Sequence, residues 1–299
     1  MPRFLPSSLA LVVVTLLTRP ASAQVLWSDE FDAGSRPDPA TWSYDLGAGG
    51  WGNRELQAYT DRPANVRVED GHLVITARAN PDTDSNARFT SARITTRDKL
   101  VFRYGTVEAR IRVPDLGAGL WPAFWTLGND FGEVGWPRCG EIDVMEMGHS
   151  DAIDAGLVNR RVGSAAHWDT QGAKGGDAAW RDAAVDLDDG FHVYRMDWTP
   201  TRITTYLDEE VIGSFRIDAE ACTDCSEFQR PHFLLLNLAV GGNYTGRLAP
   251  GAITAPLPAE LRVDYVRILD NGFTELGGAS VSTGSKARVS RRPAASNAR

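Results

Sequence analysis

Residues 136–150, WPRCGEIDVMEMGHS, place three acids, Glu141, Asp143 and Glu146, among isoleucine, valine and methionine side chains. Such apolar residues belong to a packed interior, where a lone carboxylate is costly unless it is paired, hydrogen-bonded or protonated. Three acids within six residues of this segment are therefore expected to act together.

The spacing of these acids predicts an irregular β-strand. In a strand, residues i and i+2 share a face, so Glu141 and Asp143 point the same way. Glu146 is five residues from Glu141, and a regular strand would turn it to the opposite face. One extra residue between Asp143 and Glu146 would return all three acids to one face, with Ile142 and Val144 toward the core. We therefore predict a β-bulge here.

Paired carboxylates on one strand face are typical of glycoside hydrolysis. Retaining glycosidases hold two carboxyl groups about 5–5.5 Å apart, and Glu141 and Glu146 could lean together over one ligand. Asp143 between them would raise a neighbour's pKa or hold the nucleophile by a hydrogen bond. A calcium site is the first alternative, although calcium sites draw their oxygen ligands from loops. A solvated strand face is the second. The pattern favours catalysis.

Tryptophans in glycine-rich segments support a sugar-binding cleft. Trp121 and Trp125 lie just upstream of the acids, Trp51 and Tyr59 lie in residues 50–60, and Trp168 follows a histidine. Aromatic faces pack in cores but also line ligand pockets, and segments rich in glycine favour the second role.

The N-terminus predicts export. Arg3 precedes an almost wholly apolar run over residues 9–17, and Ala21-Ser22-Ala23 provides a small-residue cleavage site. This is the pattern of a signal peptide over residues 1–23, and the run is too short to span a bilayer. We expect a secreted protein, either extracellular or periplasmic.

The charge distribution excludes some partners. The chain has a net charge of −8, and residues 1–23 and 276–299 carry basic residues but no acids. The body between them is therefore more acidic still, which argues against nucleic acid and membrane surfaces as partners. A neutral polysaccharide suits it better.

Strand patterns continue through the body. Residues 105–114, GTVEARIRVP, alternate apolar and polar side chains, and residues 232–243, HFLLLNLAVGGN, form a near-continuous apolar run. The first pattern predicts a half-buried strand and the second a strand covered on both faces. No long amphipathic helix interrupts these strands, so the chain is expected to be all-β, as a sandwich.

The remaining motifs do not predict a second catalytic site. Cys222 and Cys225 are expected to form a local disulfide in an exported protein, which leaves Cys139 either buried and inert or as a free thiol beside the acids. Residues 47–52 match G-x-G-x-x-G, but no helix follows them, so a dinucleotide site is not expected. Residues 273–299 are poor in large apolar groups and are expected to form a disordered basic tail.

The segment GEIDVMEMGH resembles the E-[ILV]-D-x-x-E signature of glycoside hydrolase family 16 in its bulged form. The shorter E-x-D-x-E spacing belongs to the lichenase and plant xyloglucan-enzyme form. The likeness continues through GWGNRELQAYT, GLWPAFWTLG, LLLNLAVGGN and VDYVRIL. It covers about residues 24–271 and implies a catalytic domain over 24–272, with a concanavalin-like β-jelly-roll sandwich and a concave substrate cleft.

The motifs are most similar to those of laminarinase-type endo-β-1,3-glucanases. By this resemblance, Glu141 is the nucleophile, Glu146 the general acid/base and Asp143 an assisting carboxylate. The positions that match cleft-lining residues of such enzymes are Asn53, Arg93, Trp121, Trp125 and His167. The loop WDTQGAKGG that begins at Trp168 departs from the family pattern.

The resemblance also implies a structural calcium ion on the convex face. Its oxygen ligands would come from Glu30, Gly71 and Asp264, whereas the chemistry itself should need no cofactor. The expected protein is a monomeric, secreted, retaining endo-β-glucanase that hydrolyses laminarin-like β-1,3-glucan by double displacement.

Several alternatives stay open. The same fold could act on mixed-linkage glucan or a galactan, could transfer sugars, or could bind β-glucan without catalysis. Both glutamates are present, which argues against a binding protein, and the acidic body argues against sulfated galactans.

Overall fold

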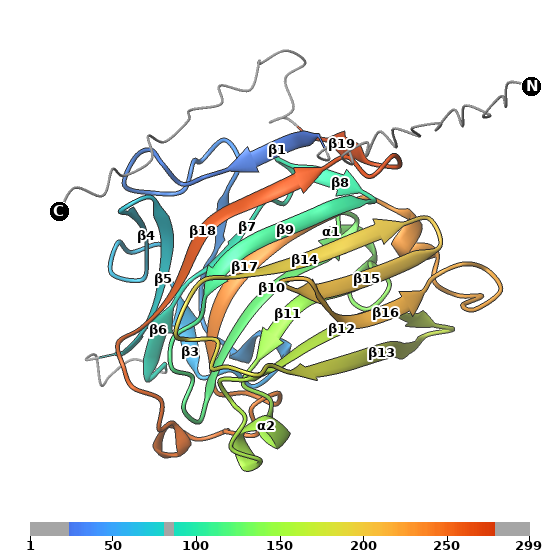
Figure 1. Cartoon of the computed structure of the whole chain (residues 1–299). Coiled ribbons are helices and arrows are strands. Elements are labelled where there is room, and N and C mark those ends of the chain that lie inside the picture. Colours follow the sequence, from blue (N-terminus) through green and yellow to red (C-terminus); the bar gives the residue numbers. More distant parts are fainter. Residues whose placement is uncertain (1–23, 81–86, 279–299) are drawn as a thin grey trace, which may run out of the picture.

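The computed structural model describes residues 24–80 and 87–278. Two β-sheets enclose the main hydrophobic core, as Figure 1 shows. The expected all-β jelly-roll sandwich is confirmed. The predicted signal, residues 1–23, lies outside the described residues. Within the described part of the chain, no helix has the length and apolar character needed to cross a membrane.

One sheet has ten strands and is antiparallel except where β3 meets β6. Its order is β16 (Glu210–Arg216), β15 (Arg202–Leu207), β14 (His192–Thr199), β9 (Gly105–Arg112), β18 (Ala259–Leu269), β5 (His72–Ala79), β6 (Phe89–Ser91) and β3 (Gln57–Tyr59), with β1 (Val25–Asp29) paired to β18 and β4 (Val66–Glu69) paired to β5.

The other sheet has nine strands and carries the acidic segment. Its order is β13 (Ala173–Asp182), β12 (Arg161–Thr170), β11 (Glu141–Met147), β10 (Leu120–Gly128), β17 (His232–Val240), β7 (Arg93–Thr95) and β2 (Ser43–Asp45), with β8 (Val101–Arg103) paired to β17 and β19 (Glu275–Gly277) paired to β8.

Helices in the described part are short. They are α1 (Phe131–Val134), α2 (Ser150–Asp154) and the 3-10 turns η1 (Gly50–Gly52), η2 (Ser226–Gln229) and η3 (Pro250–Ala252).

The two strand patterns singled out in the sequence are both confirmed. In β9, the apolar set faces the core and is fully buried, and it comprises Val107, Ala109 and Ile111. Strand β17 is buried throughout. Its Leu234 and Leu236 join the main core, whereas Phe233 and Leu235 form a second cluster on the opposite face with Leu127 and Cys139.

The boundary of the predicted tail is wrong. Residues 275–277 form β19, which pairs with Arg103, Phe102 and Val101 of β8. Half-burial of Leu276 against the core explains why these residues are ordered, because one large apolar side chain anchors a short strand. The fold therefore extends beyond residue 272, and residues 279–299 of the predicted tail lie outside the described residues.

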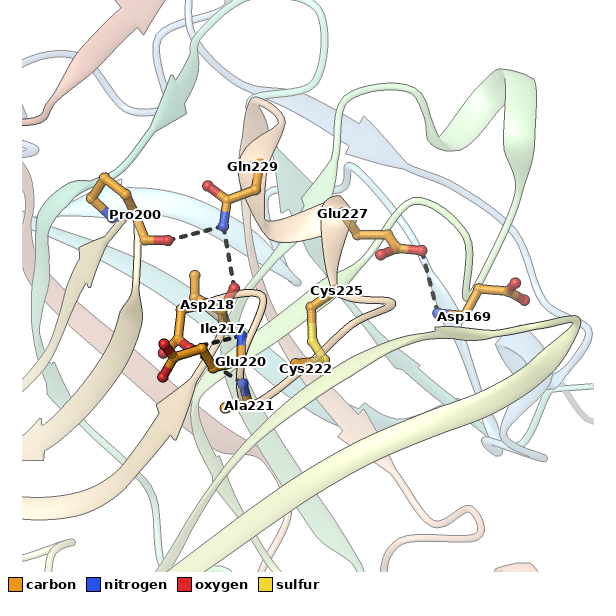
Figure 2. Close-up of a disulfide and its surroundings, with 10 residues drawn as sticks. All are labelled: Asp169, Pro200, Ile217, Asp218, Glu220, Ala221, Cys222, Cys225, Glu227 and Gln229. Atoms are coloured by element: carbon orange, nitrogen blue, oxygen red, sulfur yellow. Dashed lines mark hydrogen bonds between the residues drawn. A yellow bond between two sulfur atoms is a disulfide. The ribbon is translucent and has the colours of Figure 1, made fainter.

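The expected local disulfide is confirmed. Cys222 and Cys225 are bonded in the loop after β16 (Figure 2). Gln229 fixes the end of this loop, because its amide donates to the carbonyl oxygens of Pro200, at 3.0 Å, and Ile217, at 3.4 Å.

Candidate active site

The predicted bulge is present in β11. On β10, the consecutive residues Phe124 and Trp125 pair with Met145 and Asp143, so Val144 is the extra residue. The register with β12 shifts over the same interval. The strand therefore gains one residue between its second and third acids, as the spacing predicts.

This irregularity separates the acids from the core. Ile142 and Val144 are fully buried in the main cluster. Glu141, Asp143 and Glu146 instead line a cleft of about 820 Å³ on the outer face of the sheet. All five predicted substrate-binding residues line the same cleft, and these are Asn53, Arg93, Trp121, Trp125 and His167.

The carboxylate of Glu146 is held by an aromatic pair. The indole N–H of Trp121 donates to Glu146 Oε1 at 2.9 Å. The same indole stacks on Tyr244 with ring centroids 4.7 Å apart and planes 10° from parallel. This pair orients the Glu146 carboxyl group, and Trp121 and Tyr244 both line the cleft.

Glu141 and Asp143 share a different set of neighbours. The Nε2 atom of His167 lies 3.5 Å from Asp143 Oδ2 and 4.0 Å from Glu141 Oε1. Trp136 hydrogen-bonds to Glu141, and the Lys174 ammonium lies 5.1 Å from the centre of the Trp136 ring. A cation and the Trp136 donor therefore lie beside Glu141, and the His167 ring lies close to both carboxyl groups.

A second aromatic group lies beside the acids on β10, where Trp125 pairs with Asp143. Trp125 donates its indole N–H to Asn237 at 2.8 Å. The guanidinium carbon of Arg93 lies 4.6 Å from the centre of the Trp125 ring, and Arg93 is 2.8 Å from Asp45. Asn53 lies nearby in the cleft and contacts Glu55 at 3.5 Å.

Burial raises the pKa of all three acids. Burial, reinforced by the Glu141 carboxylate, raises the pKa of Glu146 to about 7, and the Trp121 hydrogen bond partly opposes this rise. Burial also raises the pKa of Glu141 to about 7, opposed mainly by Lys174. The pKa of Asp143 is raised well above its usual value by burial and by the charges of Glu146 and Glu141.

A protonated Asp143 can stabilise the ionised form of Glu141. The hydrogen bond between the two carboxyl groups lowers the pKa of Glu141 and raises that of Asp143. This is the effect expected when Asp143 carries the proton and donates it to an ionised Glu141. The cleft can therefore hold one ionised and one protonated glutamate near neutral pH.

The acids and His167 also form a cluster of metal-ligand atoms. One atom each from Glu141, Asp143 and His167 lies within 4.8 Å of the others. Burial lowers the pKa of His167 to about 4, so its imidazole is neutral at neutral pH. Two carboxyl groups with shared protons suit acid–base chemistry without a metal.

Cys139 lies just before the acids but takes no part in the cleft. It is fully buried among Leu127, Phe233 and Leu235. Burial raises the pKa of its thiol to about 12. Because the thiolate is the reactive form, Cys139 is inert.

The three predicted calcium ligands lie around one junction in the first sheet. Strand β5 pairs with β18 up to Val263, and β1 pairs with β18 from Val266 onward. Gly71 precedes β5, Glu30 follows β1, and Asp264 lies between the two pairings.

The carboxylates at this junction already have cationic partners. Arg267 binds Glu30 through two nitrogens, at 2.9 and 2.8 Å, and Arg110 binds Asp264 at 2.7 Å. A calcium ion here would therefore depend on backbone oxygens, which is the arrangement that the resemblance implies.

Sequence reasoning missed several residues of the cleft. Trp136, Lys174, Asn237 and Tyr244 all line it. Asn237 had a detectable signal, since it is the one amide in the otherwise apolar β17. Lys174 had none, because its segment departs from the family pattern and only strand pairing brings it near Glu141.

The comparisons agree with this geometry. The family model described as Glycosyl hydrolases family 16 matches residues 53–250. The beta-glucanase of Rhodothermus marinus is 40% identical over 256 residues, covering 82% of this chain and 84% of that protein.

Two solved structures are also similar. The laminarinase catalytic domain of Thermotoga maritima MSB8 has a TM-score of 0.71 at 37% identity, covering 84% of this chain and 99% of that chain. A Bacteroides ovatus mixed linkage glucan family 16 protein, solved with the G4G4G3G product, has a TM-score of 0.72 at 33% identity, covering 82% and 100%. The matched family model and the extent of identity show that this chain belongs to glycosyl hydrolase family 16.

Proposed function

We propose that this protein is a retaining endo-β-glucanase that hydrolyses β-1,3-glucan. The observation that carries this proposal is the bulge at Val144, which brings Glu141, Asp143 and Glu146 into one aromatic-lined cleft. Family membership and the similarity to a laminarinase support a β-1,3-linked substrate.

The reaction proceeds by double displacement. The ionised carboxylate of Glu141 attacks C1 of a glucosyl unit while Glu146 protonates the departing glycosidic oxygen, and the C1–O bond breaks. Glu146, now ionised, removes a proton from water. That water attacks C1, releases Glu141 and leaves the product with retained configuration.

The neighbours of the two glutamates support this division of labour. Asp143 and Trp136 hydrogen-bond to Glu141, and Lys174 adds a positive charge. These contacts lower the pKa of Glu141 against the larger effect of burial and so favour its ionised form. Glu146 has one donor, Trp121, and its raised pKa suits a group that gives and recovers a proton.

Mixed-linkage glucan is the second candidate substrate. The similarity to the Bacteroides ovatus protein solved with G4G4G3G favours it. Both glucans are neutral and offer apolar sugar faces to Trp121 and Trp125. Neither these tryptophans nor the catalytic acids therefore discriminate between the two substrates. The acidic body opposes a galactanase that acts on sulfated chains, and the intact acids oppose a non-catalytic glucan-binding protein.

Export and a monomeric state complete the proposal. The signal pattern over residues 1–23 supports secretion. A calcium ion bound by backbone oxygens near Glu30, Gly71 and Asp264 would stabilise the junction of β1, β5 and β18 without entering the reaction.

A substrate panel tests the proposal. The mature protein is incubated with laminarin, lichenan, agarose and xyloglucan, and the products are identified by mass and linkage. We expect laminarin to be cut into oligosaccharides with retained anomeric configuration. Cleavage of lichenan alone would favour the second candidate, and binding without any product would overturn the enzymatic assignment.

A further inference from the structure

A row of directly paired residues links Glu146 to the edge of the sheet. Glu146 of β11 pairs with Gly163 of β12, and Gly163 pairs with Trp180 of β13. Directly paired residues point to the same face. Two strand spacings place the Cα atom of Trp180 about 10 Å from that of Glu146, on the face that carries the acids.

Strand β13 exposes this face to solvent. It is the edge strand of the sheet (Figure 1), and Lys174, Gly176, Ala178 and Trp180, which alternate along it on this face, are all exposed. Lys174 already lines the cleft. Trp180 is 50% exposed, an unusual state for so large an apolar side chain in a mature fold.

Only small side chains separate the acids from this edge. Asp143 pairs with Ala165, and Ala165 pairs with Ala178. Glu146 and Trp180 are separated by Gly163 alone. No bulky side chain lies along the Asp143 row, whereas the Tyr244 hydroxyl and the Trp180 indole lie over Gly163, so an extended ligand would cross β12 over Ala165 toward β13.

An aromatic series joins Trp180 to the cleft. Tyr244, which stacks on Trp121, meets the ring of His149 edge-on at 4.9 Å, and His149 lies 5.9 Å from Trp180. The Trp180 indole also hydrogen-bonds to Tyr244. A Cβ atom at Gly163 would approach the Tyr244 hydroxyl and Trp180 Nε1 to 3.0 and 3.1 Å, so glycine permits this contact.

The hydrogen bond fixes the orientation of Trp180 without burying its ring. A tryptophan that served only to brace Tyr244 would gain stability from packing its whole ring, yet half of this side chain faces solvent. An indole whose N–H is held by a hydrogen bond while part of its ring faces solvent is suited to stacking against a ligand.

We propose that Trp180 is an outer sugar-binding site, where a pyranose ring of the glucan chain stacks after the chain leaves the catalytic acids across β12. This inference rests on the proposed function and deepens it, since it names a contact that only longer chains reach. Trp180 acts in binding and takes no part in bond cleavage.

Chain-length dependence tests the inference. Trp180→Ala, Trp180→Phe and the wild type are compared on laminarin and on short β-1,3-linked oligosaccharides. We expect Trp180→Ala to raise KM for laminarin about three- to tenfold, the range of one lost aromatic contact. The ratio of kcat/KM for laminarin to that for short substrates should fall by a similar factor. Trp180→Phe, which keeps a ring but loses the N–H, should retain most of the ratio.

A matched control removes an exposed aromatic elsewhere. Phe273 is 52% exposed in the turn before β19, and Phe273→Ala should leave the ratio unchanged. An equal loss of kcat/KM on long and short substrates in Trp180→Ala would show a purely structural role through Tyr244 and overturn the inference. An unchanged ratio would overturn it too. Neither result bears on the proposed function, which is tested separately by whether the wild type cleaves laminarin.

Discussion

Trp121 of β10 donates its indole N–H to Glu146 of β11 at 2.9 Å. The two residues are diagonal neighbours, because Glu146 pairs directly with Ala123. A side chain that stacks on Tyr244 in the cleft therefore also stabilises the ionised form of the proposed acid/base. In the proposed function, this one indole would serve both substrate binding and proton transfer.

Replacing Trp121 by Phe should shift the pH profile. The hydrogen bond lowers the pKa of Glu146 against the effect of burial, so its loss raises that pKa above about 7. Glu146 must be protonated to assist the leaving group, and it then stays protonated to higher pH. The alkaline limb of the kcat/KM profile should move up by about one pH unit, as expected for a lost hydrogen bond to a charged group.

Trp125→Phe is the control for this prediction. Its N–H donates to Asn237 and to none of the acids. If Trp125→Phe weakens substrate binding, the alkaline limb of its kcat/KM profile should still stay at the wild-type pH. A limb that stays fixed in Trp121→Phe, or that moves equally in both variants, would refute the coupling.

The two glutamates should respond differently to amide substitution. Glu141→Gln removes the nucleophile and should lower kcat by more than about 10³-fold while glucan still binds. Glu146→Gln removes proton donation, so the loss should be smaller on an aryl glucoside whose leaving group needs no proton. Normal turnover by Glu141→Gln, measured by reducing-sugar release, would contradict the assignment.

Lys174→Met should move both limbs of the profile to higher pH. The ammonium group lowers the pKa of Glu141 and, more weakly, that of Glu146, so its removal raises both. Glu141 must be ionised to attack, and the acidic limb should therefore shift most. Lys174→Arg keeps the positive charge, so the acidic limb of its profile should stay at the wild-type pH. Salt screens exposed charges, so the difference between wild type and Lys174→Met should shrink at high ionic strength.

Chelation tests the structural calcium site. Removing calcium with EDTA should lower Tm, because an ion that binds only the folded state stabilises it by mass action. The initial rate well below Tm should not change, since the proposed double displacement uses only the carboxyl groups of Glu141 and Glu146. Calcium but not magnesium should restore Tm, which differential scanning calorimetry measures. An unchanged Tm would refute the proposed calcium site near Glu30 and Asp264.

Local patterns in the sequence predict most of the strands and the common orientation of the three acids. Alternation in β9 and the apolar run of β17 are set by burial, which acts on every residue of a strand. The bulge follows from parity, since Glu141 and Glu146 cannot share a face of a regular strand. These features depend on neighbours in the chain and can be read directly.

The rest of the site depends on strand order, which no local pattern encodes. Lys174 approaches Glu141 only because β13 pairs with β12 and β12 with β11. Asn237 of β17 reaches Trp125 only because β17 pairs with β10. The end of the fold does not follow from composition, because residues 273–299 contain few large apolar side chains and the pairing of Leu276 with Phe102 depends on strand order.

The extra residue at Val144 also makes this strand tolerant of a change in length. A one-codon deletion there would straighten β11 and leave its acids at alternate positions, with Met145 taking over the vacated place in the interior. A chain with one residue fewer between these acids would therefore still present all three of them on one face of the strand.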